Sequence, residues 1–127
     1  MGWLSSRRRP PLIRRDEALG AVPVKNRFVR ESRLESGEVM LHYPVSAPPW
    51  AERIARWIGK DPAPPREGRL QLDALGTAVW ELIDGRRPVR EVAAAFAAAH
   101  QLEPREAQTA VAHFMRQLGR RGLIGLR

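Results

Sequence analysis

The sequence of 127 residues contains no cysteine, only one tyrosine and no long apolar run. Without cysteine, the chain has no disulfide, thiol nucleophile, zinc finger or iron–sulfur ligand set. Its three histidines, His42, His100 and His113, lack the spacing of a metal site. No stretch approaches the length of a transmembrane helix, and no apolar segment follows the first arginines as in a secretory signal. We therefore predict one cytoplasmic domain with no metal and no cofactor.

The net charge of +8 is concentrated near the N-terminus. Residues 1–33 contain nine Lys and Arg against three acids, whereas residues 73–127 contain eight Arg against six acids. We expect residues 1–20 to form a basic, largely disordered tail ahead of a folded domain at residues 21–127. Because a nucleic-acid-binding helix normally carries its own basic patch, the near-neutral C-terminal half argues against specific nucleic-acid binding.

The first half of that domain has the pattern of a small antiparallel sheet. Apolar and charged residues alternate through Arg27–Tyr43, and Ser36 and Gly37 supply turn chemistry in the middle. This pattern predicts a hairpin whose second strand ends before Pro44. A third strand is predicted at Arg69–Leu72, as the shortest strand and at an edge of the sheet.

A segment at residues 45–66 separates the second and third predicted strands and contains a predicted short helix, Trp50–Gly59. Its apolar residues recur at helical spacing, and they are Trp50, Ile54, Trp57 and Ile58. With Arg53, Arg56 and Lys60 nearby, this face can contact a membrane or a partner, or pack on the sheet of the same chain. The sequence favours packing on the sheet, in which case Trp57→Ala should cost about 3 kcal/mol or more.

Three amphipathic helices are predicted to follow the third strand. The first has Asp73 as N-cap and Gly85 as its stop, the second opens at Pro88, and the third runs from Pro104 to Gly122. Their predicted inward residues are Leu75, Ala78, Val79, Leu82 and Ile83, then Val89, Val92, Ala93, Phe96 and Ala97, then Ala107, Ala110, Val111, Phe114 and Leu118.

Two functional classes are disfavoured by the residues present. No nucleophile and base pair, no paired carboxylates and no glycine-rich phosphate loop is recognisable, so we predict no catalytic residue and no enzyme. The alternative function is a winged-helix DNA-binding transcriptional regulator. Its third helix would offer Arg105, Gln108, Thr109 and Arg116 to DNA, but only five residues follow Gly122, which is too short for a wing hairpin.

A run of residues in the C-terminal half resembles the PqqD-like family, named for a peptide chaperone of pyrroloquinoline quinone biosynthesis. The run is Leu72-Asp73-x-Leu75-Gly76-x-x-Val79-Trp80-x-Leu82-Ile83-Asp84-Gly85, followed by Val89-x-x-Val92, Phe114-x-x-Leu118 and Gly122-Leu123-Ile124. The resemblance implies an α+β fold, with a three-stranded antiparallel sheet followed by a three-helix winged-helix-type bundle. The basic tail and the segment at residues 45–66 depart from the compact family pattern.

The resemblance also implies a function as a RiPP recognition element, a module that binds the leader of a ribosomally made, post-translationally modified peptide. The leader would add a strand beside the third strand and be presented to a peptide-modifying enzyme, with the radical SAM type as the candidate class. The implied peptide-binding residues are Arg69, Leu70, Gln71 and Leu72 on the strand and Arg105, Gln108, Ala112 and Met115 on the third helix.

The direction of the backbone N–H groups makes this mechanism testable. Because successive N–H groups of a strand point to opposite sides, Leu70→Pro and Gln71→Pro should behave differently. One should keep the fold and lose the peptide, and the other should break the sheet, but the sequence does not say which.

Overall fold

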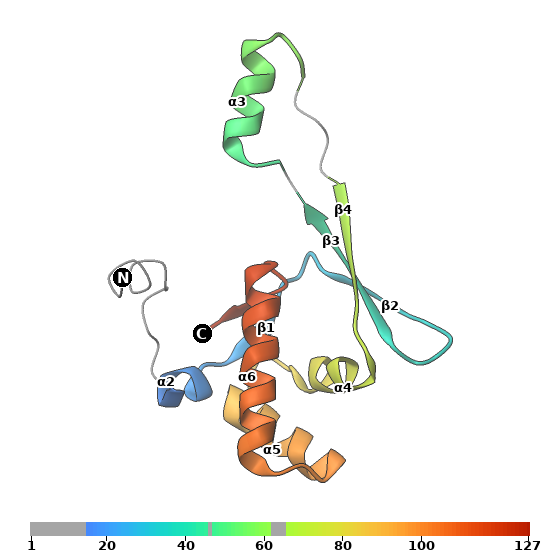
Figure 1. Cartoon of the computed structure of the whole chain (residues 1–127), viewed down its shortest axis with the longest axis vertical. Helices are drawn as coiled ribbons and strands as arrows, with labels where there is room; N and C mark the ends of the chain where they lie inside the picture. Colours follow the sequence, from blue (N-terminus) through green and yellow to red (C-terminus); the bar gives the residue numbers. More distant parts are fainter. Residues whose placement is uncertain (1–14, 46, 62–65) are drawn as a thin grey trace, which may run out of the picture.

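The computed structural model of the chain describes residues 15–45, 47–61 and 66–127, which form five helices and five strands (Figure 1). In chain order these elements are α2 (Arg15–Gly20), β1 (Pro23–Lys25), β2 (Arg30–Arg33), β3 (Val39–Val45), α3 (Pro49–Trp57), β4 (Arg66–Gln71), α4 (Ala74–Leu82), α5 (Val89–His100), α6 (Pro104–Arg120) and β5 (Ile124–Leu126).

The strands form two antiparallel sheets, one of order β2-β3-β4 and one of order β1-β5. This arrangement confirms the α+β class and the three-stranded antiparallel sheet. As predicted, β4 lies at an edge, but with six residues it is longer than β2, which has four. The expectation that the third strand is the shortest is therefore wrong.

Strand β3 also continues through Pro44, where the sequence predicted its end. Pro44 pairs with Glu67 of β4. The nitrogen of Pro44 faces the side of β2. Because the β2–β3 ladder ends at the Arg30–His42 pair, no residue of β2 lies opposite Pro44, and its missing N–H removes no ladder hydrogen bond.

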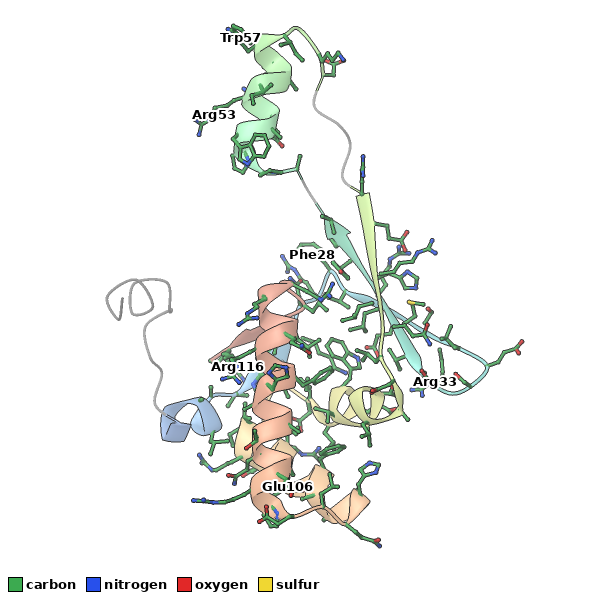
Figure 2. The ribbon with its side chains drawn as sticks, in the orientation of Figure 1. Phe28, Arg33, Arg53, Trp57, Glu106 and Arg116 are labelled. Atoms are coloured by element: carbon green, nitrogen blue, oxygen red, sulfur yellow. The ribbon has the colours of Figure 1, made fainter. Side chains whose placement is uncertain are left out.

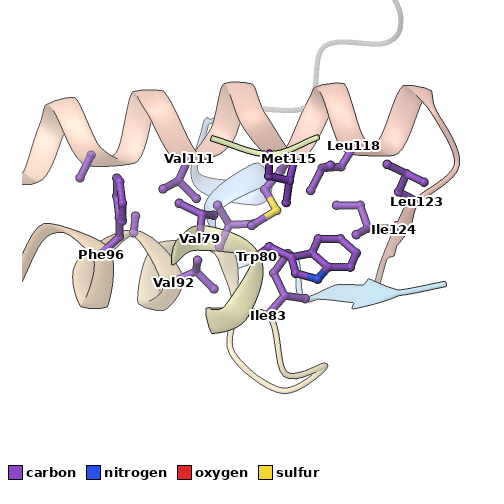
Figure 3. Packing of buried hydrophobic residues seen from close by; sticks show 14 of the residues in the cluster. Val79, Trp80, Ile83, Val92, Phe96, Val111, Met115, Leu118, Leu123 and Ile124 are labelled. Atoms are coloured by element: carbon purple, nitrogen blue, oxygen red, sulfur yellow. The ribbon is translucent and has the colours of Figure 1, made fainter. Parts of the chain in front are cut away.

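The hydrophobic core lies between helices α4, α5 and α6 and the inner face of β3. Figure 3 shows its side chains from the three helices, together with Leu123 and Ile124. Trp80 of α4 is fully buried near its centre, with the Lys25 ammonium 4.6 Å from the ring centroid. Because Trp80 occupies this position, the buried face of α4 is rotated from the predicted one, and Leu75 is left half exposed. Likewise α6 buries Ala107, Val111, Met115 and Leu118, while Ala110 is exposed and Phe114 half-buried.

Local backbone chemistry fixes where the helices begin. The Asp73 carboxylate accepts a hydrogen bond from the Gly76 N–H at 2.7 Å, which confirms the predicted N-cap of α4. Glu103 caps α6 in the same way through the Glu106 N–H at 3.0 Å, with Pro104 in the first turn. Between α5 and α6, Gln101 turns the chain in the left-handed conformation, with φ 54°. These caps set the directions of α4 and α6.

The two ends of the described domain are joined in a way the sequence did not reveal. Helix α2, which lies within the expected tail, contacts α5 and α6, and its Leu19 packs against the core. The other part of the expected tail, residues 1–14, lies outside the described residues. Strand β5 follows α6 and pairs with β1.

Helix α3 stands apart from the rest of the fold, beyond the far ends of β3 and β4 (Figure 1). None of its residues is buried, and Trp57 is 86% exposed. The expectation that its tryptophan face packs on the sheet is therefore wrong, because the two strands carry the helix past the end of that sheet. Among the described residues, no helix is both long and apolar enough to cross a membrane.

Candidate functional site

A groove of about 700 Å³ separates β4 from α6. One wall is the end of β4 and its exit, the floor is formed by α4 and α5, and the other wall is α6. The lining residues are Leu70, Gln71, Leu72 and Asp73; Leu75, Gly76 and Val79; Phe96 and Leu102; and Ala110, Val111, His113, Phe114, Gln117, Leu118, Arg120 and Arg121. Its lining is largely apolar, and Leu75 and Leu102 remain exposed within it, so the groove offers hydrophobic surface to a ligand.

The edge of β4 beside this groove presents unpaired backbone groups. The Leu72 N–H donates to the Val39 carbonyl at 2.9 Å, on the β3 side. Because the direction alternates along an antiparallel strand, Leu70 also points its N–H toward β3, whereas Arg69 and Gln71 point theirs away from it. No described strand pairs with that side of β4. The structure thus resolves the choice that the sequence left open.

One end of the groove is cationic. Arg120 and Arg121, in the last turn and at the C-cap of α6, both line it. The Arg121 guanidinium also donates to the Tyr43 hydroxyl at 3.1 Å, which ties the end of α6 to β3. The Tyr43 ring crosses β4 at Gly68, where an added Cβ would lie 2.6 Å from Tyr43 Cε2. Glycine at position 68 therefore permits the contact that holds Arg121 at the groove.

The strand residues that were predicted to bind a peptide lie at this groove. Leu70, Gln71 and Leu72 line it, and the Gln71 amide also donates to Glu38 at 3.3 Å. Arg69 contributes only its backbone to the free edge, because its side chain lies on the outer face of the sheet, 3.8 Å from the Glu67 carboxylate.

The helix residues that were predicted for the site lie elsewhere. Met115 is 3% exposed and belongs to the core. Gln108 and Ala112 are half-buried and do not line the groove. Arg105 lines a separate, shallower hollow of about 480 Å³ with Glu106, Thr109, Ala110 and His113.

The difference between the predicted flank of α6 and the flank that lines the groove has a simple geometric cause. An apolar helix stripe has two flanks, and the sequence does not state which flank faces β4. The groove lies on the flank of Ala110 and Phe114, which the sequence had placed in the core. A signal was present, because those two residues make the apolar stripe broader than the core seam of Ala107, Val111 and Leu118 requires.

The outer face of the sheet carries a polar cluster that sequence reasoning missed. The Ser32 hydroxyl lies 2.8 Å from His42 Nε2, and His42 Nδ1 lies 2.5 Å from Glu67 Oε1. This is the order of groups in a serine hydrolase triad. Here the three side chains come from adjacent strands, with Ser32 and Glu67 exposed and His42 half-buried. The carboxylate also pairs with Arg30 and Arg69. We interpret the cluster as a cross-strand ladder that stabilises the sheet.

This cluster perturbs the Glu67 carboxyl group. The hydrogen bond from His42, followed by the charges of His42, Arg30 and Arg69, holds the pKa of Glu67 below its ordinary value of 4.5. The register of the three strands would have predicted this cluster. His42 lies opposite Arg30 on β2 and Arg69 on β4, and Ser32 and Glu67 are each two residues from these positions on the same face.

The features of a DNA-reading helix are incomplete. Within the described part of the chain, α6 is followed by β5 alone, which pairs with β1 rather than forming a wing hairpin. The Thr109 hydroxyl, expected to face DNA, donates to the Arg105 carbonyl at 3.0 Å. Glu106 lies beside Arg105 and Thr109 in the same hollow, and its charge disfavours phosphate binding there.

Comparison with known proteins finds one family match, in the C-terminal half of the chain. Residues 63–124 match the family model described as Coenzyme PQQ synthesis protein D (PqqD). The match spans β4, α4, α5 and α6, which together contain the groove and its free strand edge. No curated protein and no solved structure matches the chain.

Proposed function

Through residues 63–124 this chain belongs to the PqqD family, and we propose that it captures the leader of a ribosomal precursor peptide by strand addition to β4. Family membership supports a peptide-chaperone role in biosynthesis of the pyrroloquinoline quinone type, and a non-catalytic one. The observation that carries the more specific proposal is the free edge of β4 lying along an apolar groove.

Strand addition uses the backbone of β4 and the side chains of the groove in different ways. The outward N–H and carbonyl groups of Arg69 and Gln71 bind the backbone of an extended peptide and set its register. Alternate side chains of the peptide then point toward α6. Leu75, Leu102 and Phe114 favour apolar side chains at those positions.

The charge of the groove selects among apolar leaders. Arg120 and Arg121 at one end favour a leader with an acidic residue flanking its apolar positions. Arg105 does not take this role, because it lies in the separate hollow.

The finer fold assignment and the cellular setting follow from this proposal. We assign α4, α5 and α6 to a winged-helix-type bundle in which α6 lines a peptide groove instead of reading DNA. The bound leader is presented to a peptide-modifying enzyme, for which a radical SAM enzyme is our candidate. We place this work in the cytoplasm, where ribosomal precursors are made.

The direct test uses the leader of a short precursor encoded next to this gene, made as a synthetic peptide and titrated into the labelled full chain. Backbone amide shifts are expected at Arg69, Gln71 and the groove-lining residues of α6. Shifts that bypass both β4 and α6 would overturn strand addition for this protein. Tight, salt-resistant binding of duplex DNA by the same preparation would favour the winged-helix regulator instead.

A pair of proline variants tests the role of the backbone. Gln71→Pro removes an N–H from the free edge, so the fold should be retained and leader binding lost. Leu70→Pro removes an N–H that faces β3, so the protein should unfold or lose much of its stability.

Leu70→Ala and Gln71→Ala are the controls for this pair, because they remove the side chain and keep the backbone N–H. Gln71→Ala also removes the hydrogen bond to Glu38. Circular dichroism melting measures the fold, and calorimetry with the leader measures binding. Equal loss of stability in both proline variants would contradict the assigned N–H directions.

A further inference from the structure

Helix α3 has an apolar face that nothing in the described chain covers. This face, hereafter the arm face, consists of Trp50, Ile54, Trp57 and Ile58. The exposed fraction of these residues ranges from 52% for Ile54 to 86% for Trp57. The helix buries no residue at all. Figure 2 shows Trp57 at the distal end of α3, remote from the labelled residues of the body. The arm face is therefore available to a ligand outside the chain.

Basic side chains border the arm face. Arg53 lies one turn from both Trp50 and Trp57, and Arg56 follows it around the helix. Neither arginine forms an ion pair within the described residues. By helical geometry Arg53 lies about 60° from Trp50, Arg56 about 120° and Glu52 about 160°, so the acid lies farther from Trp50 than either arginine. The charge next to the apolar surface is thus positive.

From these observations we propose that α3 binds the surface of an anionic lipid bilayer, with the arm face in the headgroup region. Tryptophan is enriched at that depth, because its ring is apolar and its N–H can reach water and headgroups. Arg53 and Arg56 then lie near the lipid phosphates, and Glu52 faces water. An apolar face bordered by arginine is the pattern of helices that lie in the membrane interface. This proposal is independent of the proposed function of the groove.

The length and position of α3 agree with this occupant. Nine residues make a helix too short to be stable alone in water, so it gains from a surface that orders it. Its place beyond the ends of β3 and β4 lets the arm face reach a flat surface without the body intervening (Figure 1).

The sequence supports an anionic rather than a neutral surface. Trp3 and Leu4 precede Arg7, Arg8 and Arg9, so the chain carries a second segment that combines an aromatic residue with arginines. Peripheral binding generally requires two such weak signals, and each arginine near an anionic surface strengthens it.

The test is flotation of the full chain with vesicles of phosphatidylcholine, alone or mixed with phosphatidylglycerol. We expect binding to the mixed vesicles and little to the neutral ones. Trp57→Ala should lower the partition coefficient about tenfold, the order expected for losing one buried aromatic ring. Arg53→Glu combined with Arg56→Glu should also abolish the preference for phosphatidylglycerol.

The matched control is Phe28→Ala, which removes an aromatic side chain that is also mostly exposed, but on the body. It should leave vesicle binding unchanged, and the α3 variants should keep the melting temperature and leader affinity of the parent.

Four results would overturn the proposal. The first is equal binding of wild type and Trp57→Ala to mixed vesicles, and the second is no binding by the wild type. The third is a lipid-free dimer in size-exclusion chromatography that Trp57→Ala converts to a monomer, which would assign the arm face to a second copy of the chain. Loss of an enzyme interaction in Trp57→Ala without vesicle binding would likewise replace lipid by a protein partner.

Discussion

The bundle of α4, α5 and α6 and the isolated helix α3 contain tryptophans in opposite environments. Trp80 is 0% exposed and Trp57 is 86% exposed, although both lie on amphipathic helices. The bundle helices are joined by short turns and cover one another, whereas α3 is carried past the end of the sheet. An apolar stripe on a helix therefore predicts that this face is buried against a partner. Whether that partner is another part of the same chain depends on the segments that join the helix to the rest of the fold.

The largest expected effect is in the bundle. Trp80→Ala removes the largest fully buried side chain and leaves a cavity in the core next to Lys25 of β1, so it should cost about 3–5 kcal/mol of unfolding free energy. Urea denaturation measures this change. A loss below about 1 kcal/mol would mean that the core collapses around the gap. Burial of Trp80 would then not distinguish it energetically from the exposed Trp57.

A smaller effect is expected where β4 meets Tyr43. In Gly68→Ala the new Cβ meets Tyr43 Cε2 at 2.6 Å and Val45 Cγ2 at 2.8 Å, so the ring must move and the bond to Arg121 is lost. We expect a cost of about 1–3 kcal/mol, together with weaker leader binding.

The control for this variant is Gly125→Ala in β5, where an added Cβ has no neighbour within 4 Å. It should leave both stability and leader binding near the parent values. If the two alanine variants behave alike, the contact between Tyr43 and Gly68 is not needed to keep Arg121 at the groove.

Trp57→Ala should have almost no effect on stability, within about 0.5 kcal/mol, because the side chain packs on nothing in the described chain. The sequence alone predicted a loss of about 3 kcal/mol. Thermal melting without lipid distinguishes the two values, and a large loss would mean that α3 packs on the body in solution.

The smallest expected effect depends on pH. The pKa of Glu67 is lowered in the folded state, first by the His42 hydrogen bond, so the stabilising contribution of Glu67 is present above its ordinary value of 4.5 and is lost as the pH falls through its lowered value. Wild type should therefore lose slightly more melting temperature than Glu67→Gln when acidified below 4.5. The difference should be small, because Glu67 is open to solvent.

The sequence predicted the parts of the fold that depend on local chemistry. Asp73 and Pro104 marked helix starts, and the residues around Ser36 and Gly37 marked the hairpin, because caps and turns are short-range interactions. The edge position of β4 was predicted from the strand pattern. Leu70 to Leu72 were implied by the family resemblance, and they line the groove.

What the sequence did not predict depends on contacts between distant segments. The rotation of α4 around Trp80 and the flank of α6 that faces β4 are set by packing, which a helical period leaves open. The outer-face cluster required the register of three strands. The exposure of α3 depended on the reach of the strands that carry it.

The pairing of β1 with β5 has a consequence for the order of folding. Pro23 and Leu126 are about a hundred residues apart, and between their strands in sequence lie all the other strands of the described residues. Closing so long a loop is entropically costly, whereas α5 and α6 meet across a short turn. We therefore expect the helices to associate while β1 is still free. During synthesis β1 stays unpaired until β5 has left the ribosome, so its edge is exposed to wrong partners for that time.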